Sequence, residues 1–426
     1  MEISALWMAR AQFTLSLNFL VLFAALATAL GWLLVFMRWR SIRRSDGGWQ
    51  AAYRFWARIF ALTLIIALGC ALPFLVELGT LWPSLLERIG NVAGPLLAAS
   101  IVTFFVIKAV FLGVMLFGQK RASPLGHLFS IFMVSVGLSA TVFWGLVLQS
   151  WTHTPDGATL IDGRYQVFDW VEVVFNASLG WQVLLFFSGA GLICAFLLIG
   201  VSAWQALRRP LEDGERATVV TAYWLAIVSL LILGVAIDGN ERLVAQYRPA
   251  AAAAVMGYLE HPSPVSTTLS TRWLGRNADG TIRGLELPDG QSPPVELLYW
   301  LARFALVLIA AIACLLIVSA WYRKRTGPDV SNYPAWLLRW AVWSAWAAVA
   351  AWLALWNLVD ISRFPYLVWG TLLQADLATE TDAFTLMLGF GAMIVCYGLL
   401  TLGFVTLLRH AARFGVVPVR KPGGRI

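Results

Sequence analysis

The chain has 426 residues, of which 60% are hydrophobic and only 13% are charged, and its mean hydropathy is +0.75. Soluble globular domains carry about 25% charged residues, so this composition excludes a soluble globule. It predicts an all-α, polytopic membrane protein, because helices satisfy their own backbone hydrogen bonds in lipid. The four cysteines lie inside apolar runs without a C-x-x-C pair, so no metal motif is predicted.

Nine apolar stretches are long enough to cross a bilayer. In chain order they cover residues 13–37, 55–77, 92–118, 125–150, 180–206, 217–237, 295–321, 334–358 and 383–408. An odd number of crossings places the two termini on opposite sides of the membrane. Residues 1–30 are not expected to be a cleaved signal peptide, because only Arg10 precedes an apolar run that exceeds the roughly 7–15 residues of a signal core.

Basic residues gather in the loops on one side of the predicted membrane. They follow the first, third, fifth, seventh and ninth stretches, as Arg38, Arg40, Arg43 and Arg44; Lys120 and Arg121; Arg208, Arg209 and Arg216; Arg323, Lys324 and Arg325; and Arg409, Arg413, Arg420, Lys421 and Arg425. By the positive-inside rule, the N-terminus lies outside and the C-terminus is cytoplasmic. The net charge of +8 therefore reflects topology, and no nucleic-acid partner is predicted.

The predicted organisation has four parts. Residues 1–237 form transmembrane helices one to six, 238–293 an extracytoplasmic segment, 294–408 helices seven to nine, and 409–426 a basic cytoplasmic tail. The segment 238–293 is rich in Pro, Gly, Ser and Thr and is too long for a bare connector between packed helices. We expect it to be a functional cover or a mobile segment.

Charged side chains within or beside the apolar stretches are the first candidates for function, because an unpaired charge in hydrocarbon is costly. They are Lys108 in "FFVIKAVFLG", Arg303 in the seventh stretch, and Asp360 and Arg363 just past the eighth. In one interpretation Lys108 pairs with a carboxylate, while the arginines snorkel or cap helix ends. In the other, Lys108 titrates in a buried pocket on a proton or quinone pathway. Spacing alone does not separate the two.

Histidine and tryptophan placement limits the cofactors. His153 and His261 are predicted in outer loops and His127 at the start of the fourth stretch, so none lies in mid-helix, where membrane cytochromes place axial imidazoles. A conventional bis-histidine haem is therefore excluded.

A stripe of tryptophans on the eighth stretch is more typical of packing or an interfacial belt than of cofactor contact: Trp336, Trp340, Trp343 and Trp346, followed by Trp352 and Trp356.

Five short blocks resemble subunit I of the cytochrome bd quinol oxidases. They are "RAQFTLSLNFLVLF" at 10–23, "FWARIFAL" at 55–62, "LGTLW" at 78–82, "VFLGVMLFGQKR" at 110–121 and "IGVSAW" at 199–204. The resemblance spans nearly the whole chain. It implies nine helices packed as two four-helix bundles plus one peripheral helix, a bacterial or archaeal plasma (inner) membrane, and quinol binding by the outer segment.

The resemblance implies which residues of this chain stand at the family's haem-ligand positions, and at these positions the chain has residues that do not bind iron. The histidines of helices one and five correspond to Leu20 and Leu185, and the methionine of helix seven to Ala305, although the arginine two residues earlier is kept as Arg303. The two glutamates of helix three correspond to Ser100 and Lys108. Both carboxylates are therefore missing.

A few of the family's functional positions are kept. Trp356, Asp360 and Arg363 match the end of helix eight, which makes Asp360 the one surviving candidate for an iron-proximal ligand. In the outer segment, the lysine and glutamate associated with quinol correspond to Arg248 and Ala253, so Arg248 is the candidate quinone-loop residue. The carboxylate that would accept a quinol proton is absent.

Because haem iron needs axial ligands, the sequence predicts no bound haem and leaves quinone binding open. The chain is then a non-catalytic structural subunit of a respiratory, quinone-linked electron-transport complex. Its partners would be a bd-type subunit II or a haem-bearing subunit I paralogue, with phospholipid around it. Three alternatives remain: a quinol oxidase subunit with unorthodox haem ligation, a haemless proton-conducting or quinone-docking subunit, and a pure assembly scaffold.

Overall fold

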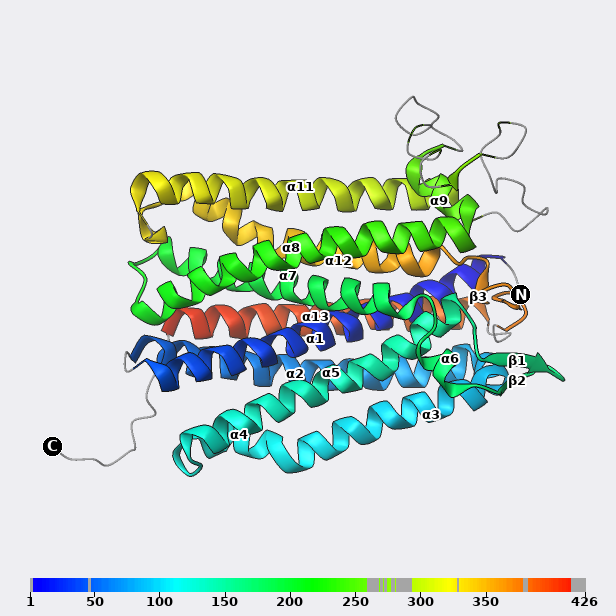
Figure 1. Cartoon of the computed structure of the whole chain (residues 1–426), viewed down its shortest axis with the longest axis horizontal. Helices are drawn as coiled ribbons and strands as arrows, with labels where there is room; N and C mark the ends of the chain where they lie inside the picture. Colours follow the sequence, from blue (N-terminus) through cyan, green and yellow to red (C-terminus); the bar gives the residue numbers. More distant parts are fainter. Residues whose placement is uncertain are drawn as a thin grey trace.

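The computed structural model describes residues 3–44, 47–258, 268, 271, 274–276, 280, 293–327, 329–377 and 382–414. In this part of the chain nine helices are long and apolar enough to cross a membrane, which confirms the predicted number of spans. The helices run side by side, with the start of α1 and the end of α13 at opposite ends (Figure 1).

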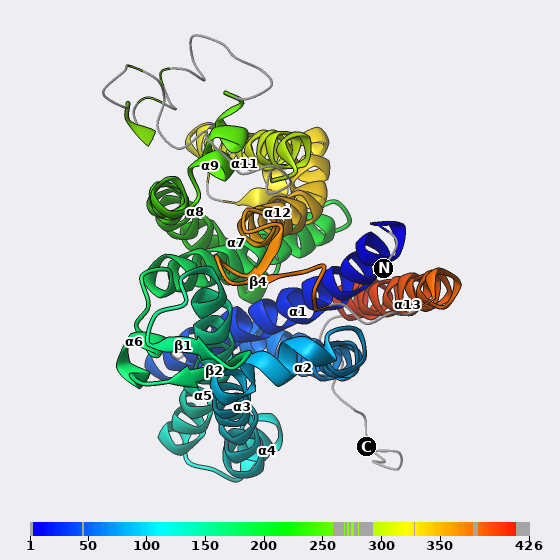
Figure 2. The ribbon, with the colours of Figure 1, turned by 90° about the vertical axis from the view of Figure 1, so that its right-hand side faces the viewer.

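The N-terminal half forms one set of packed helices. Helix α1 (Ile3–Arg43) packs along α2 (Gly47–Leu81), and α5 (Pro124–His153) contacts both α1 and α3 (Pro83–Ile107). Beyond α3 the chain passes through a π-helical turn, η1 (Lys108–Leu112), then α4 (Gly113–Phe117) and a 3-10 turn, η2 (Gly118–Lys120). Helix α3 lies at the rim of the molecule (Figure 2), so most of its surface is not covered by this chain.

A second set surrounds the most buried helix, α7 (Leu179–Ala206), which packs against α8 (Asp213–Tyr247) and α12 (Ala335–Ile361). Helix α11 (Val295–Thr326) packs on α12, and α13 (Ala383–Phe414) lies along α1. Small residues let α7 approach its neighbours, as is usual in membranes. A Cβ at Gly200, for example, would lie 3.1 Å from the Cβ of Ala345 in α12.

Short elements cover the end of the helices that holds the start of α1 (Figure 1). They are α6 (Trp170–Val174), α9 (Pro249–Met256) and two antiparallel hairpins, β1–β2 (Ala158–Ile161 with Arg164–Val167) and β3–β4 (Tyr366–Val368 with Leu372–Leu373). In the first hairpin Asp162 and Gly163 both have positive φ, as a two-residue type I′ turn requires. A 3-10 turn, η3 (Val330–Asn332), precedes α12.

The helices extend beyond the apolar stretches that predicted them. Helix α8 continues to Tyr247 and α9 follows directly, so the first part of the predicted outer segment 238–293 is helical. Hydropathy detects only the part of a helix that lies in hydrocarbon, and "DGNERLVAQY" is too polar for it. Most of residues 259–292 and the tail 415–426 lie outside the described residues.

Candidate functional site

Six polar side chains meet at the end of the helices that holds the start of α1, and we refer to them as the Asp360 cluster. They come from α1, the last turn of α5, the residue after α8 and the end of α12: Arg10, Gln149, His153, Arg248, Asp360 and Arg363. The chain thus brings together two residues predicted as site candidates at the end of α12 with one from the predicted quinone segment.

The carboxylate of Asp360 is engaged on both oxygens. Its Oδ1 lies 2.5 Å from Nη2 of Arg363 and accepts a 3.3 Å hydrogen bond from the Gln149 amide, while Oδ2 lies 4.0 Å from Nη2 of Arg10. The side chains of Asp360, Arg363 and Arg10 are between 10% and 13% exposed. A carboxylate held by two guanidinium groups in this way is not free to bind iron.

Arg248 and His153 form the second part of the cluster. Nη1 of Arg248 donates to Nδ1 of His153 at 2.8 Å and to the hydroxyl of Ser362 at 2.9 Å, and all three residues are buried. The other ring nitrogen of His153, Nε2, lies 3.4 Å from the side-chain amide nitrogen of Gln149. Burial, together with the nearby charge of Arg363, lowers the pKa of Arg248 below that of a solvated arginine.

The cluster holds more positive than negative charge. Arg10, Arg248 and Arg363 contribute three guanidinium groups against Asp360 and the buried Glu241, which lies within electrostatic range of Arg248. Such a site has hydrogen-bond donors for an anionic or carbonyl oxygen but no nucleophile paired with a base. Its hydrogen bonds and ion pairs connect α1 with the ends of α5, α8 and α12.

The β3–β4 hairpin and the residues beside it contact the cluster through Arg10 and Arg248. Nη1 of Arg10 donates to Oε1 of Gln374 at 2.8 Å, and its guanidinium lies 5.0 Å from the ring centroid of Phe364, which stacks on Trp7. Trp369 lies between the two strands of the hairpin, and its ring centroid is 5.7 Å from the guanidinium of Arg248. The hairpin therefore covers the cluster from the side facing away from the helices.

Arg303 belongs to a different arrangement. Its guanidinium donates to the backbone carbonyl groups of Val255 and Met256, the latter at 3.0 Å, and lies 3.9 Å from the ring centroid of Tyr299. These carbonyl groups are at the C-terminal end of α9, where a positive charge is favourable. Arg303 therefore caps a helix end, and that helix is α9 rather than its own.

Lys108 is the first residue of the π-helical turn, and its side chain is exposed. In the part of the chain that the structure describes, neither the predicted ion pair with a carboxylate nor a buried pocket is found for it. A lysine at the centre of a membrane helix costs about 2.5–3.5 kcal/mol even on insertion scales. Ser100, on the same helix, turns inward and donates to the carbonyl of Thr141 at 2.9 Å.

The positions at which the resemblance expects haem ligands are packed with apolar groups. Leu185 and Ala305 are buried, and Leu20 is half-buried. One turn beyond Leu185, a Cβ at Gly189 would lie 1.8 Å from the indole of Trp352, so that ring occupies the space beside α7. Phe186 packs edge-on against both Trp352 and Trp356.

The tryptophan stripe of α12 has two parts. Trp336, Trp343 and Trp346 are exposed, as expected of an interfacial belt, whereas Trp352 and Trp356 are buried. One of the exposed rings, Trp346, also lines a cavity between helices α1, α7, α12 and α13.

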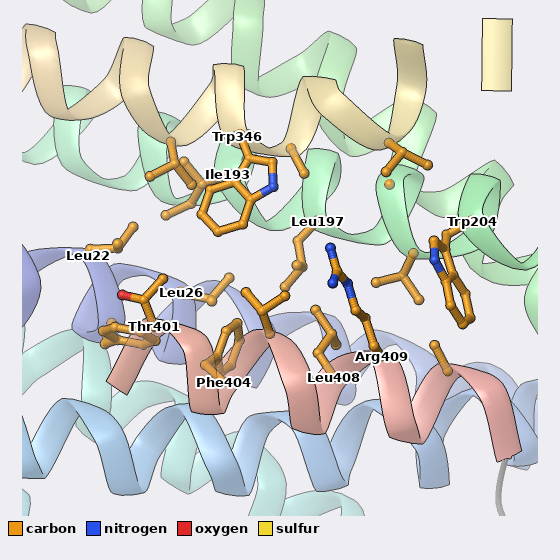
Figure 3. Close-up of a pocket in the computed structure, with 18 residues that line it drawn as sticks. Leu22, Leu26, Ile193, Leu197, Trp204, Trp346, Thr401, Phe404, Leu408 and Arg409 are labelled. Atoms are coloured by element: carbon orange, nitrogen blue, oxygen red, sulfur yellow. The ribbon is translucent and has the colours of Figure 1, made fainter. Parts of the chain in front are cut away.

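A cavity of about 160 Å³ lies between α1, α7, α12 and α13. Figure 3 shows its apolar lining, including Leu26, Leu197 and Phe404, with Arg409 and Trp204 toward one end. Its walls have no acid, histidine or cysteine, so it offers no acid–base or ligand chemistry.

His153 is the residue that sequence reasoning misplaced. It was predicted in an outer loop, but it is the last residue of α5 and is fully buried. Hydropathy ended the helix at residue 150, because Trp151, Thr152 and His153 are not aliphatic. Pro155 was the missed signal, since helices usually end at or before the residue preceding a proline.

Comparison with known proteins gives concordant matches. A family model described as cytochrome bd terminal oxidase subunit I matches residues 8–273 and 270–416. The chain is 27% identical to the cytochrome bd-II ubiquinol oxidase subunit 1 of Escherichia coli K12, over 60% of the chain but only 51% of that protein. It is 22% identical to the cytochrome bd ubiquinol oxidase subunit 1 of Bacillus subtilis 168, over 96% of the chain and 94% of that protein.

The bd oxidase structure from Geobacillus thermodenitrificans has the same fold. The two match with a TM-score of 0.83 and 20% identity, covering 96% of this chain and 98% of that chain. The family model accounts for almost every residue between 8 and 416. This multi-pass membrane protein therefore belongs to the cytochrome bd terminal oxidase subunit I family.

Proposed function

We propose that the chain holds no haem and acts as a non-catalytic structural subunit of a quinone-linked respiratory complex. The observation that carries this proposal is the packing of Trp352 against Gly189, one turn from Leu185. The indole takes the space beside a position where the resemblance expects an axial histidine. Leu20, Leu185 and Ala305 offer iron no nitrogen or sulfur donor.

Unorthodox ligation through Asp360 fits the geometry poorly. Its carboxylate is bound by Arg363 and Gln149 and faces Arg10. Nδ1 of His153, the histidine in the same cluster, accepts from Arg248. Either side chain would have to break a buried hydrogen bond to reach a metal, so we derive no reaction step through haem.

The link to quinones comes from relatives. The two relatives described above are named as ubiquinol oxidase subunits, so we place this chain in a complex that exchanges electrons with a quinone pool. We assign Arg248 to holding the ends of α8 and α12 together, because its guanidinium is buried against His153 and Ser362. A quinol contact in the complex would then involve other groups.

We further propose the membrane arrangement. The contacts support two four-helix bundles, α1–α2–α3–α5 and α7–α8–α11–α12, with α13 peripheral and the N-terminus on the outer face of a bacterial inner membrane. Cysteines introduced as Arg164→Cys and Lys324→Cys test the orientation with an impermeant maleimide. Residue 164 should react in intact cells and residue 324 only after permeabilisation, and the reverse would refute the orientation.

As partner we propose a bd-type subunit II or a haem-bearing subunit I paralogue. Copurification of the tagged chain from its own membrane, followed by mass spectrometry, identifies it. Recovery of the chain as a stable monomer, free of any membrane subunit, would contradict the proposal.

Haem content is the decisive measurement. The pyridine haemochrome assay on the purified chain should give far less than one haem per chain, while a bd subunit I that has its haem-ligand histidines, purified in the same detergent, retains its haem. Stoichiometric haem would overturn the proposal and favour an oxidase with unorthodox ligands. Quinol-dependent oxygen uptake would then be measured next.

A further inference from the structure

We infer that the outward face of α3 around Lys108 is a docking surface for a membrane helix of a second protein, and that this helix carries an aspartate or glutamate at the depth of Lys108. The inference deepens the proposed subunit role and rests on it. It names the chemistry that the partner must supply, which the role alone does not.

Two opposite faces of α3 are distinguished by their contacts. The inward face lies on α5: Ser100 bonds to Thr141, and Ile107 packs so closely on Gly137 that a Cβ there would lie 2.0 Å from its side chain. The outward face is apolar and exposed. Ile101 and Phe105 are 57% and 68% exposed, and they precede Lys108 by seven and three residues, on the same side of the helix.

Lys108 lies deep in the hydrocarbon region. From Val92 to Gly118 it is the only charged residue, and this stretch spans roughly 40 Å of helix, with Lys108 roughly 15 Å from the Gly118 end. Helical side chains lean toward the N-terminus, so the lysine points away from the nearer membrane surface. Lipid phosphates lie outside a core about 30 Å thick and therefore do not supply its counter-charge.

The charge of Lys108 defines what the partner must offer. Within the residues that the structure describes, no side chain forms an ion pair or hydrogen bond with it. A facing helix that is purely apolar would bury the ammonium group unpaired. A carboxylate at the same depth would form a charge-assisted hydrogen bond, and the exposed aliphatic and aromatic groups around Lys108 would supply the packing surface.

A second copy of this chain does not meet this requirement. Among the described acids within the membrane-spanning helices, Glu77, Glu241 and Asp360 are buried in the chain, and Asp238 is paired with Arg242 at 2.8 Å near the end of α8. The occupant is therefore a helix of a different protein, which agrees with a hetero-oligomeric role.

The experiment begins with a photo-crosslinker. We would replace Phe105 by p-benzoylphenylalanine in the full-length chain, irradiate the native membrane and identify the attached peptide. Ile317, on α11 and 70% exposed, is the matched position on another face. The inference expects the label at 105 to reach a transmembrane helix of another protein that contains Asp or Glu, and the label at 317 not to reach it.

Charge exchange then tests the ion pair. Lys108→Met should lower copurification of that protein at least tenfold, whereas Lys108→Arg and the apolar control Val102→Met leave it near the wild-type yield. Lys108→Asp combined with the partner's acid changed to lysine should restore the complex. The unfolding temperature of each variant chain shows that it is folded.

Three outcomes would overturn the inference: crosslinks from residue 105 to lipid only, a crosslinked helix without an acid, or full copurification of Lys108→Met. None depends on haem content, so a failure here leaves the haem assay to judge the proposed function. Conversely, a chain found to contain haem could still dock through Lys108.

Discussion

Arg363 and Asp360 lie three residues apart at the end of α12, with Nη2 and Oδ1 separated by 2.5 Å and neither side chain more than 13% exposed. The pair sits among Arg10, Arg248 and Gln149. The cluster is therefore most sensitive to the loss of its single well-paired acid.

Asp360→Asn should destabilise the chain by about 3–5 kcal/mol, because it leaves buried guanidinium groups without a counter-charge. Thermal unfolding in detergent measures the loss. Glu87→Gln removes an ion pair to Arg164 in which both side chains are more than half exposed, and it should cost less than about 1 kcal/mol. Equal unfolding temperatures for Asp360→Asn and wild type would contradict the central role of Asp360.

Arg303→Met should loosen α9 without unfolding the chain. It removes two hydrogen bonds to the carbonyl groups of Val255 and Met256, at a cost of roughly 1–3 kcal/mol. Hydrogen exchange over residues 249–256 should become faster in Arg303→Met. The exchange rate of Arg303→Lys should lie between those of Arg303→Met and the wild type, because an ammonium group does not bind two carbonyl groups in the planar geometry of a guanidinium group. Arg242→Gln, which breaks only the exposed pair with Asp238, is the control. Unchanged exchange in Arg303→Met would refute the capping role.

Gly189→Ala should destabilise the chain by at least about 1–3 kcal/mol, because the new methyl group would lie 1.8 Å from Trp352. The second change Trp352→Leu should recover part of this loss, so a double-mutant cycle in thermal unfolding would be strongly non-additive. Gly234→Ala is the same substitution at a helical glycine with no neighbour within 4 Å, and it should be neutral or slightly stabilising. Additive effects would show that Trp352 does not fill the space beside Gly189.

The loop before α12 gives a pH-dependent prediction. Asp329 accepts from the backbone N–H of Ser331 at 2.9 Å and pairs with Arg216 at 3.0 Å, and both contacts lower the pKa of Asp329. The pKa of Asp329 is lower in the folded protein than in the unfolded chain, where it is about 4. These contacts therefore stabilise the fold at a pH above about 4, and their contribution is lost as the pH falls through the folded-state pKa.

Asp329→Asn should therefore cost less than about 1 kcal/mol at pH 7, since both partners are partly exposed. The difference in unfolding temperature between this variant and wild type should shrink as the pH drops below 4. A difference that persists unchanged at pH 3 would contradict this account.

The membrane-spanning helices were predictable because each contains an apolar run of bilayer length. Helices α7 and α13 begin within one residue of the predicted stretches. The direction in which polar and charged side chains point was not predictable, because it depends on which neighbour a helix packs against. Ser100 and Lys108 lie on one helix, yet only contact with α5 makes the first inward and the second outward.

The Asp360 cluster was predictable only in part. Asp360, Arg363 and Arg248 were candidates, but Arg10, Gln149 and His153 come from distant segments and have no local pattern that joins them. Tertiary packing of α1, α5, α8 and α12 creates the cluster. Whether haem is absent rests on the resemblance and on the packing of Trp352, and the haemochrome assay tests it.

The π-helical turn at Lys108–Leu112 makes this stretch sensitive to length as well as to composition. A π turn holds one residue more than an α turn. Deleting one residue here would allow a regular helix without redirecting the residues beyond it, because four residues of α-helix turn the chain about as far as five in a π turn, whereas inserting one residue would rotate them by about 100°. Met115, whose carbonyl lies 3.1 Å from Nε2 of His127 and accepts from Tyr53, would turn away from both after an insertion but not after a deletion. Single-residue insertions between Lys108 and Leu112 should therefore be tolerated less well than single-residue deletions there.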